Sequence, residues 1–339
     1  MRQASVSAPP PARRVWRGLE ESRIAMALRI LRSLALLVTL TAAVAGARGA
    51  TGHPPGHFLT VHGATLWAES EGQGEPLVLI AGGPGLSHDY FHPYFSGLAH
   101  SFRIVYFDAF GRGRSERAKS PADYTFARDV EDLEGLRKAL GLTRIHLLGH
   151  SYGALVAQAY AARYPATTGK LVLVNGMFTG KMWQTTMDRS NQEIRKRLPD
   201  VWAELQAIRA RGLRSSSSEY QSVYRLPPGF YFHHDDPAHK SLPLAIEPSV
   251  YFSIAGEDAG FVAGKDVAQL DFRQTLKSLR TPILILAGRF DGIAPPEFAQ
   301  QMKKAIPTVK VVTFEKSSHY VFIEETQKAL EAIQRFLEK

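Results

Sequence analysis

The sequence predicts an α/β protein whose mostly parallel sheet is covered by helices on both faces. Short apolar runs of strand length alternate with amphipathic stretches along most of the chain. Runs such as Leu77–Ile80 are apolar at consecutive positions, which is typical of strands buried on both faces. A third observation is the segment Gly149–Gly153 (Gly-His-Ser-Tyr-Gly), which stands between an apolar run and a helical stretch. The 339 residues suffice for one large domain or two small ones.

The expected elements begin with a hairpin of two short strands around a turn at Gly63. One helix is expected to end at Gly141, because the residues before it place their apolar side chains on one face. A second helix follows Ser151 and ends near Tyr164. The strands are expected at residues 58–61, 65–69, 77–80, 103–107, 145–148, 170–174, 282–287 and 309–314, and the first and last helices at residues 127–140 and 324–337.

The alternation of strands and helices breaks over residues 177–279, which we expect to form a cap, or lid. The cap is inserted between two parts of one core, at residues 51–176 and 280–339. Helical patterns occur in it at residues 182–197 and 199–211, and the serine run at residues 215–218 is expected to be a solvated loop.

Residues 1–50 have the pattern of a secretory leader. Arg29 and Arg32 precede an uncharged apolar stretch, which small residues follow up to Ala47 and Ala50. The stretch is shorter than the roughly 20 residues that a membrane-spanning helix needs. We therefore expect cleavage near Ala47 or Ala50 and a secreted or periplasmic protein, with membrane attachment only through an uncleaved leader.

Charge and composition argue against a nucleic-acid-binding surface. The formal net charge is +9, of which +6 belongs to residues 1–50, and the remainder has no basic stripe with interleaved aromatic residues. The chain contains no cysteine, which excludes disulfides and Cys-ligated metals. The partner is expected to be a small molecule or short peptide, and the sequence does not specify an oligomeric state.

Ser151 is the candidate nucleophile. It is the centre of a G-x-S-x-G segment in the strand–turn–helix context of a nucleophile elbow. Gly149 and Gly153 remove side chains where strand and helix nearly touch. The turn lifts the Ser151 hydroxyl to the N-terminus of a helix, where developing negative charge is stabilised. The competing interpretation is a chance glycine-rich turn.

Asp291 and His319 are the candidate partners of Ser151. A serine hydroxyl needs a base to become nucleophilic, and a carboxylate must fix the tautomer of that base. In this arrangement the chain order is serine, acid, histidine. Asp291 follows the strand expected at residues 282–287, and His319 is the only histidine after it. The alternatives are a turn-forming Asp-Gly pair and a surface histidine.

The backbone N–H groups of Tyr152 and Gly83 are the candidate oxyanion donors. Tyr152 comes directly after the nucleophile, and Gly83 lies in the loop Ala81-Gly82-Gly83-Pro84-Gly85 that follows an early strand. The glycines allow that loop to turn its amides inward. A phosphate cradle is the rival interpretation, but the loop has neither G-x-G-x-x-G nor a following lysine.

No cofactor or metal site is predicted. The histidines are scattered along the chain, and no H-E-x-x-H motif occurs. His150 is expected to pack against the sheet, whereas His233 and His234 belong to the cap, as substrate contacts or as surface residues.

These motifs, in this order, resemble the α/β-hydrolase superfamily from about residue 57 to the end. Residues 108–115 are similar to the D-x-x-G-x-G-x-S turn of cap-bearing members, and residues 81–85 resemble the H-G-G-P-G loop of the proline iminopeptidases. Ala81 stands where that family has histidine. The resemblance implies an N-terminal exopeptidase with a helical cap between its sixth and seventh strands.

The expected function is that of a secreted serine hydrolase acting on short peptides with a free N-terminus. A carboxylate should then meet the substrate ammonium, with Glu204, Glu247, Glu257 and Asp258 as candidates. A carboxylesterase or lactone hydrolase with the same triad is the alternative. A non-catalytic ligand receptor on a hydrolase scaffold is an alternative of another class. Ser151 at the elbow argues against a dehalogenase or epoxide hydrolase, which has an aspartate nucleophile there.

Overall fold

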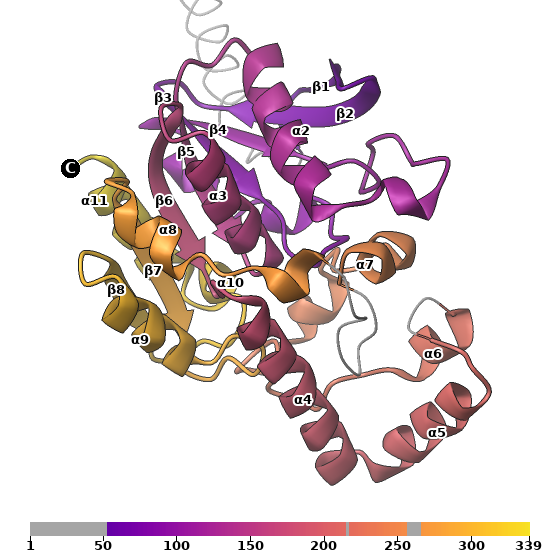
Figure 1. Ribbon diagram of the computed structural model, residues 1–339. Coiled ribbons are helices and arrows are strands. Elements are labelled where there is room, and N and C mark those ends of the chain that lie inside the picture. Colours follow the sequence, from indigo (N-terminus) through magenta and orange to yellow (C-terminus); the bar gives the residue numbers. More distant parts are fainter. Residues whose placement is uncertain (1–52, 215–216, 256–265) are drawn as a thin grey trace, which may run out of the picture. The chain divides into compact units, whose positions relative to one another are not determined.

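The computed structural model describes residues 53–214, 217–255 and 266–339 (Figure 1). The secretory leader predicted at residues 1–50, together with Glu257 and Asp258, lies outside the described residues. Among the helices that are described, none is long and apolar enough to cross a membrane.

An eight-stranded, mostly parallel sheet forms the centre of the unit from His53 to Lys339, which confirms the predicted α/β class. The strand order is β1-β2-β4-β3-β5-β6-β7-β8. Only the pairs β1–β2 and β2–β4 are antiparallel. The strands are β1 (Gly56–Val61), β2 (Ala64–Glu71), β3 (Glu75–Ile80), β4 (Phe102–Phe107), β5 (Ile145–His150), β6 (Thr168–Val174), β7 (Ile283–Gly288) and β8 (Lys310–Phe314).

Two apolar cores lie on opposite faces of this sheet. Successive side chains of a strand point to opposite faces, so Leu147 joins one core and Leu148 the other. Helices that contribute to the first core are α2 (Phe126–Ala139), α3 (Tyr152–Arg163), α8 (Arg273–Ser278) and α9 (Pro296–Ala305). The second core is closed by α10 (Val321–Glu324), α11 (Thr326–Leu337) and two 3₁₀ turns, η1 (Asp89–Phe91) and η2 (Ser96–Leu98).

Helices also fill the chain between β6 and β7, where α4 and α5 extend away from the sheet in Figure 1. Ile194, Leu205 and Ile208 pack there in a small core of their own. Ser217 caps a helix by accepting a hydrogen bond from the Tyr220 N–H, so part of the serine run is not the expected loop. The elements are α4 (Gly180–Arg197), α5 (Pro199–Ala210), α6 (Ser218–Val223), η4 (Pro237–Ser241), α7 (Pro248–Ala255) and η5 (Asp266–Gln269).

The C-terminal helix predicted at residues 324–337 is observed as α11, from Thr326 to Leu337, and the short helix α10 precedes it. The helix is divided at Glu325, which has a non-helical backbone (φ −131°, ψ 53°). Its carboxylate accepts hydrogen bonds from the Lys316 N–H (3.0 Å) and the Ser317 hydroxyl (2.6 Å). Glu325 therefore fixes the loop that leads to His319, and the helical conformation is interrupted at this residue. A further 3₁₀ turn, η3 (Pro121–Asp123), precedes α2.

Candidate active site

Ser151 stands on a sharp turn between β5 and α3, in a left-handed backbone conformation (φ 55°, ψ −117°). Such a conformation is strained for a residue other than glycine and is common at functional sites. The turn requires its glycines, because a Cβ on Gly149 would lie 2.2 Å from the Gly153 carbonyl oxygen. A Cβ on Gly153 would lie 2.2 Å from the oxygen of Ile80. The local geometry is that of a nucleophile elbow.

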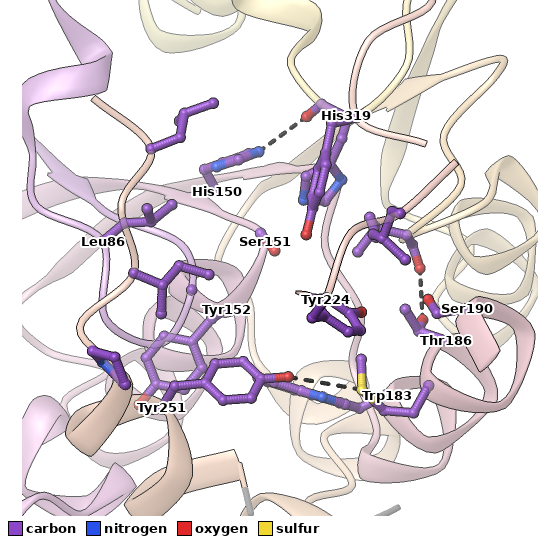
Figure 2. A pocket seen from close by; sticks show the side chains of 18 of the residues that line it. Leu86, His150, Ser151, Tyr152, Trp183, Thr186, Ser190, Tyr224, Tyr251 and His319 are labelled. Carbon is purple, nitrogen blue, oxygen red and sulfur yellow. Dashed lines mark hydrogen bonds between the residues drawn. The ribbon is translucent and has the colours of Figure 1, made fainter. Parts of the chain in front are cut away.

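His319 is fixed by Asp291. Its Nδ1 lies 2.9 Å from Oδ2 and 3.1 Å from Oδ1 of that carboxylate, and both residues are buried. The main-chain N–H of His319 donates to the Tyr231 carbonyl (2.9 Å). Its Nε2 has no hydrogen-bond partner among the described residues, and the side chain lines the same cavity as Ser151 (Figure 2). Asp291 thus holds one ring nitrogen, and the other is available to a hydroxyl.

Asp291 is itself held by three donors. Its Oδ1 accepts from the N–H groups of Ile293 (2.7 Å) and Ala294 (2.8 Å), and its Oδ2 accepts from the Asn175 side-chain amide (2.6 Å). Sequence reasoning missed Asn175, which follows β6 with a left-handed backbone (φ 47°). The signal that could have found it is a polar residue at the carboxyl end of an apolar strand.

His150, beside Ser151, connects two loops, because its ring contacts Tyr90 in one and His319 in the other. Its Nδ1 lies 2.9 Å from the Tyr90 hydroxyl, and its Nε2 lies 3.0 Å from the His319 carbonyl oxygen. Burial, and then the nearby His319, hold the pKa of His150 well below its ordinary value. The neutral ring can therefore act as a structural link without adding positive charge beside Ser151.

The loop after β3 carries the candidate oxyanion donor Gly83. Gly83 has φ 116°, and a Cβ there would lie 2.4 Å from the Gly85 nitrogen, so the position requires glycine. The Gly82 N–H donates to the buried Tyr90 hydroxyl (2.9 Å). Tyr90 therefore holds the start of this loop. Tyr152 is the first residue of α3, where a helix leaves N–H groups without partners inside the helix.

A buried ion pair contacts the first residue of α3, Tyr152. The Arg112 guanidinium donates two hydrogen bonds to Asp129, at 2.7 and 2.6 Å. The Tyr152 hydroxyl donates to the same carboxylate at 2.6 Å. This pair fixes the side chain of the residue whose N–H is a candidate oxyanion donor.

The cavity above Ser151 has a volume of about 300 Å³ and is mainly apolar and aromatic (Figure 2). It brings together Gly83, Tyr152, Ser151 and His319, so four of the five predicted site residues line one space. Asp291, the fifth, contacts His319 and does not itself line the cavity. Side chains between β6 and β7 contribute much of the remaining wall: Met177, Trp183, Met187, Tyr220, Tyr224, Tyr231, Ile246 and Tyr251.

No aspartate or glutamate occurs among the described residues that line the cavity. Glu204 lies on the exposed side of α5. Glu247 is half-buried and is not a lining residue, although Ile246 and Pro248 on either side of it are. His233 and His234 do not line the cavity either, and the His233 ring stacks on Phe290 at 3.7 Å.

Comparison with known proteins places these features in a family. The family model described as the alpha/beta hydrolase fold matches residues 75–220 and 254–326. The proline iminopeptidase of Saccharolobus solfataricus is 31% identical over 278 residues, which cover 79% of this chain and 86% of the relative. The proline iminopeptidase of Clostridium botulinum is 29% identical, over 80% of this chain and 92% of the relative.

Solved structures show the same fold. The crystal structure of a proline iminopeptidase from Mycobacterium smegmatis superposes with a TM-score of 0.66 at 23% identity, covering 84% of this chain and 98% of that one. The crystal structure of VinJ gives a TM-score of 0.71 at 24% identity, covering 85% and 99%. The chain belongs to the α/β-hydrolase fold family. The two curated relatives named above are proline iminopeptidases.

Proposed function

We propose that this protein is a serine hydrolase that releases N-terminal residues, proline in particular, from short peptides through an acyl-enzyme. One observation carries the proposal. Asp291 holds Nδ1 of His319, while Nε2 of the same ring makes no hydrogen bond among the described residues and the side chain lines the cavity of the strained Ser151. The similarity to proline iminopeptidases supports the choice of substrate.

In the proposed reaction, His319 Nε2 takes the proton of Ser151 Oγ as that oxygen attacks the carbonyl carbon of the substrate. The N–H groups of Gly83 and Tyr152 stabilise the oxyanion. The carbon–nitrogen bond then breaks, and the proton on Nε2 passes to the leaving amine. Water, deprotonated by the same nitrogen, attacks the acyl carbon and releases the acid and the free Ser151 hydroxyl. Asp291 remains ionised and stabilises the imidazolium throughout.

The cavity supports a compact apolar residue at the N-terminus of the substrate. Its aromatic wall suits a pyrrolidine ring. Ser190 of α4 supplies a polar contact, because its hydroxyl is buried and makes no hydrogen bond among the described residues. We expect the Ser190 hydroxyl to meet the substrate amine. The charge of that amine would otherwise enter an apolar space at a cost.

A carboxylesterase or lactone hydrolase is the second candidate function. The observation that favours it is the composition of the described wall, which has no carboxylate to bind an ammonium group. An ester with an apolar acyl group would use the same nucleophile and needs no such partner.

Parallel assays separate the two functions. The purified chain is given proline 4-nitroanilide, its N-acetylated form, and short-chain nitrophenyl esters. Turnover of the free anilide but not of the acetylated one is expected, and Ser190→Ala should raise KM for the anilide with little change in kcat. Thr185→Ala, on an exposed position of the same helix, is the matched control. Ester turnover without release of proline would contradict the peptidase and support the esterase.

We further propose export through the leader at residues 1–50, which would make the protein secreted or periplasmic. N-terminal sequencing of protein recovered outside the cytoplasm tests this. A mature chain beginning after Ala47 or Ala50 is expected, and recovery of the uncleaved chain inside the cell would contradict it. The cap at residues 177–279 remains a prediction.

A further inference from the structure

A second cluster of histidines lies outside the catalytic cavity. His53, Glu69, His88 and His92 bring one ligand atom each within 4.8 Å of one another, and none of them lines the cavity of Ser151. Glu69 comes from the interior of β2, His88 and His92 flank η1, and His53 precedes β1. The side chains of Glu69 and His88 are fully buried.

The separations of the three imidazole nitrogens from Glu69 are close to those between ligands of one ion. Glu69 Oε2 lies 3.0 Å from His53 Nδ1, 3.3 Å from His88 Nε2 and 3.4 Å from His92 Nε2. A tetrahedral ion with bonds of about 2.0–2.1 Å holds its ligand atoms about 3.3–3.4 Å apart. Each imidazole nitrogen therefore lies near ligand-to-ligand distance from the Glu69 oxygen, and all four ligand atoms lie within 4.8 Å of one another.

Two of these nitrogens lie near Glu69 without forming a hydrogen bond to any described residue. His88 Nε2 and His92 Nε2 are buried and make no hydrogen bond among the described residues, and neither does Asp89 Oδ1 beside them. His88 Nδ1 lies 2.8 Å from Asp108 Oδ1. A proton held on Nδ1 by that carboxylate leaves the lone pair of Nε2 directed at Glu69. Carboxylates orient metal-binding histidines in this way.

The charged groups around the cluster are mostly negative, which favours the binding of a cation. Glu69 Oε1 already accepts from the Trp67 indole (2.8 Å) and the Arg114 guanidinium (3.0 Å), so Oε2 is the oxygen that faces the imidazoles. Glu69, Asp89 and Asp108 bring three negative charges, which the single charge of Arg114 does not balance. A divalent cation would offset this excess of negative charge.

We propose that His53, Glu69, His88 and His92 bind one divalent transition-metal ion, with Zn²⁺ as the occupant. Imidazole and carboxylate donors suit Zn²⁺, and four protein ligands make a closed, structural site. This proposal replaces the sequence-based expectation of no metal. The signal that was overlooked is the spacing of four between His88 and His92, which is the spacing of the two histidines in H-E-x-x-H.

The site would order the loop that carries the candidate oxyanion donor. Tyr90 lies between His88 and His92, and its hydroxyl contacts both the Gly82 N–H and His150. An ion held by the two histidines would fix η1 and, through Tyr90, the start of the loop. Cleavage of the leader after Ala47 or Ala50 would keep His53 in the mature chain.

The first test measures metal content directly. The full chain is purified without a histidine tag, and its metals are quantified by mass spectrometry before and after dialysis against a chelator. Zinc is then returned by calorimetric titration. One equivalent of zinc, a higher Tm in the zinc-loaded form, and visible tetrahedral bands with Co²⁺ are expected. One equivalent of another divalent ion would support the site and overturn the choice of zinc.

Variants test the ligands. His53→Ala, at a partly exposed position, should weaken zinc binding at least about 10-fold, and Asp108→Asn should weaken it by about 10–100-fold through His88. His57→Ala removes another exposed histidine, on β1, and should bind zinc like the parent. Circular dichroism verifies the fold of each variant. Absence of stoichiometric zinc binding, or equal affinity in His53→Ala and the parent, would overturn the proposal.

Discussion

The two histidine–carboxylate clusters of this chain differ in how many imidazoles share one carboxylate. At Asp291 a single imidazole is held through Nδ1, and its Nε2 faces a cavity with a hydroxyl. At Glu69 three imidazoles lie around one oxygen, and two of their nitrogens are buried and make no hydrogen bond within the described part of the chain. The first arrangement suits proton transfer and the second suits cation binding. The surroundings, and not the residue types, separate the two roles.

The largest expected effect is on the proposed catalytic cluster of Ser151, Asp291 and His319. Ser151→Ala should lower kcat by a factor on the order of 10⁶, because the covalent route is lost and only binding and oxyanion stabilisation remain. The hydrolysis of proline 4-nitroanilide measures it. The zinc content of this variant should equal that of the parent. A kcat close to that of the parent would mean that Ser151 is not the nucleophile, and the proposed difference in role between the two clusters would not hold.

A smaller loss is expected from Asp291, the carboxylate that we propose orients the base. Asp291→Asn keeps the shape of the side chain but places the His319 proton on the wrong nitrogen, so kcat should fall by a factor on the order of 10⁴. Steady-state kinetics should show the loss in kcat, with KM little changed. Asp235→Asn, at an exposed position, is the control. Equal kcat in Asp291→Asn and the control would remove Asp291 from the triad.

Tyr90→Phe tests the connection between the two clusters. Removal of the hydroxyl leaves the Gly82 N–H without its acceptor and His150 without a partner at Nδ1. An unsatisfied buried donor costs about 1–3 kcal/mol, so urea denaturation should show a loss of that size. We expect kcat to fall about 10-fold.

Tyr94→Phe is the matched control, because the Tyr94 hydroxyl makes no hydrogen bond among the described residues. The two variants should differ in kcat and should bind zinc equally well. If Tyr90→Phe retained the kcat of the parent, Tyr90 would not order the oxyanion loop.

The smallest expected effect is on stability, and it comes from Glu134, whose carboxylate pairs with Arg137. Hydrogen bonding to Arg137 is the main cause that lowers the pKa of Glu134 to about 2, with Tyr160 adding to it and burial opposing it. The stabilisation from charged Glu134 is therefore present above its ordinary pKa of 4.5 and is lost as the pH falls toward 2.

Glu134→Gln should lower stability at pH 7 by on the order of 1 kcal/mol, and the difference from the parent should shrink as the pH approaches 2. Thermal denaturation between pH 7 and pH 2 measures this trend. A difference that grew with acidity would contradict the assigned direction of the pKa shift.

The sequence predicted the elements and site residues that depend on local pattern or on chain order. Every strand was expected, and Ser151, Asp291 and His319 followed from the order of the elements that precede them. Residues recruited across the fold were not predictable in this way. Asn175 meets Asp291 only because β6 and β7 are neighbours.

The Glu69 cluster shows the same limit more strongly. The antiparallel pairing of β2 with β4 places Glu69 beside Tyr106, close to the loop that carries His88 and His92. From the sequence alone, only the spacing of four residues between His88 and His92 pointed to this cluster. The helix α9 was also not anticipated, because its ten residues give a short apolar pattern.

The most direct test of the central claim is covalent labelling with a fluorophosphonate probe, followed by peptide mass spectrometry. A hydroxyl activated by His319 should take up one probe per chain, on Ser151. His319→Ala should slow that labelling by several orders of magnitude. Absence of labelling, which a ligand receptor on this scaffold would show, contradicts the account, and so does equally fast labelling of His319→Ala.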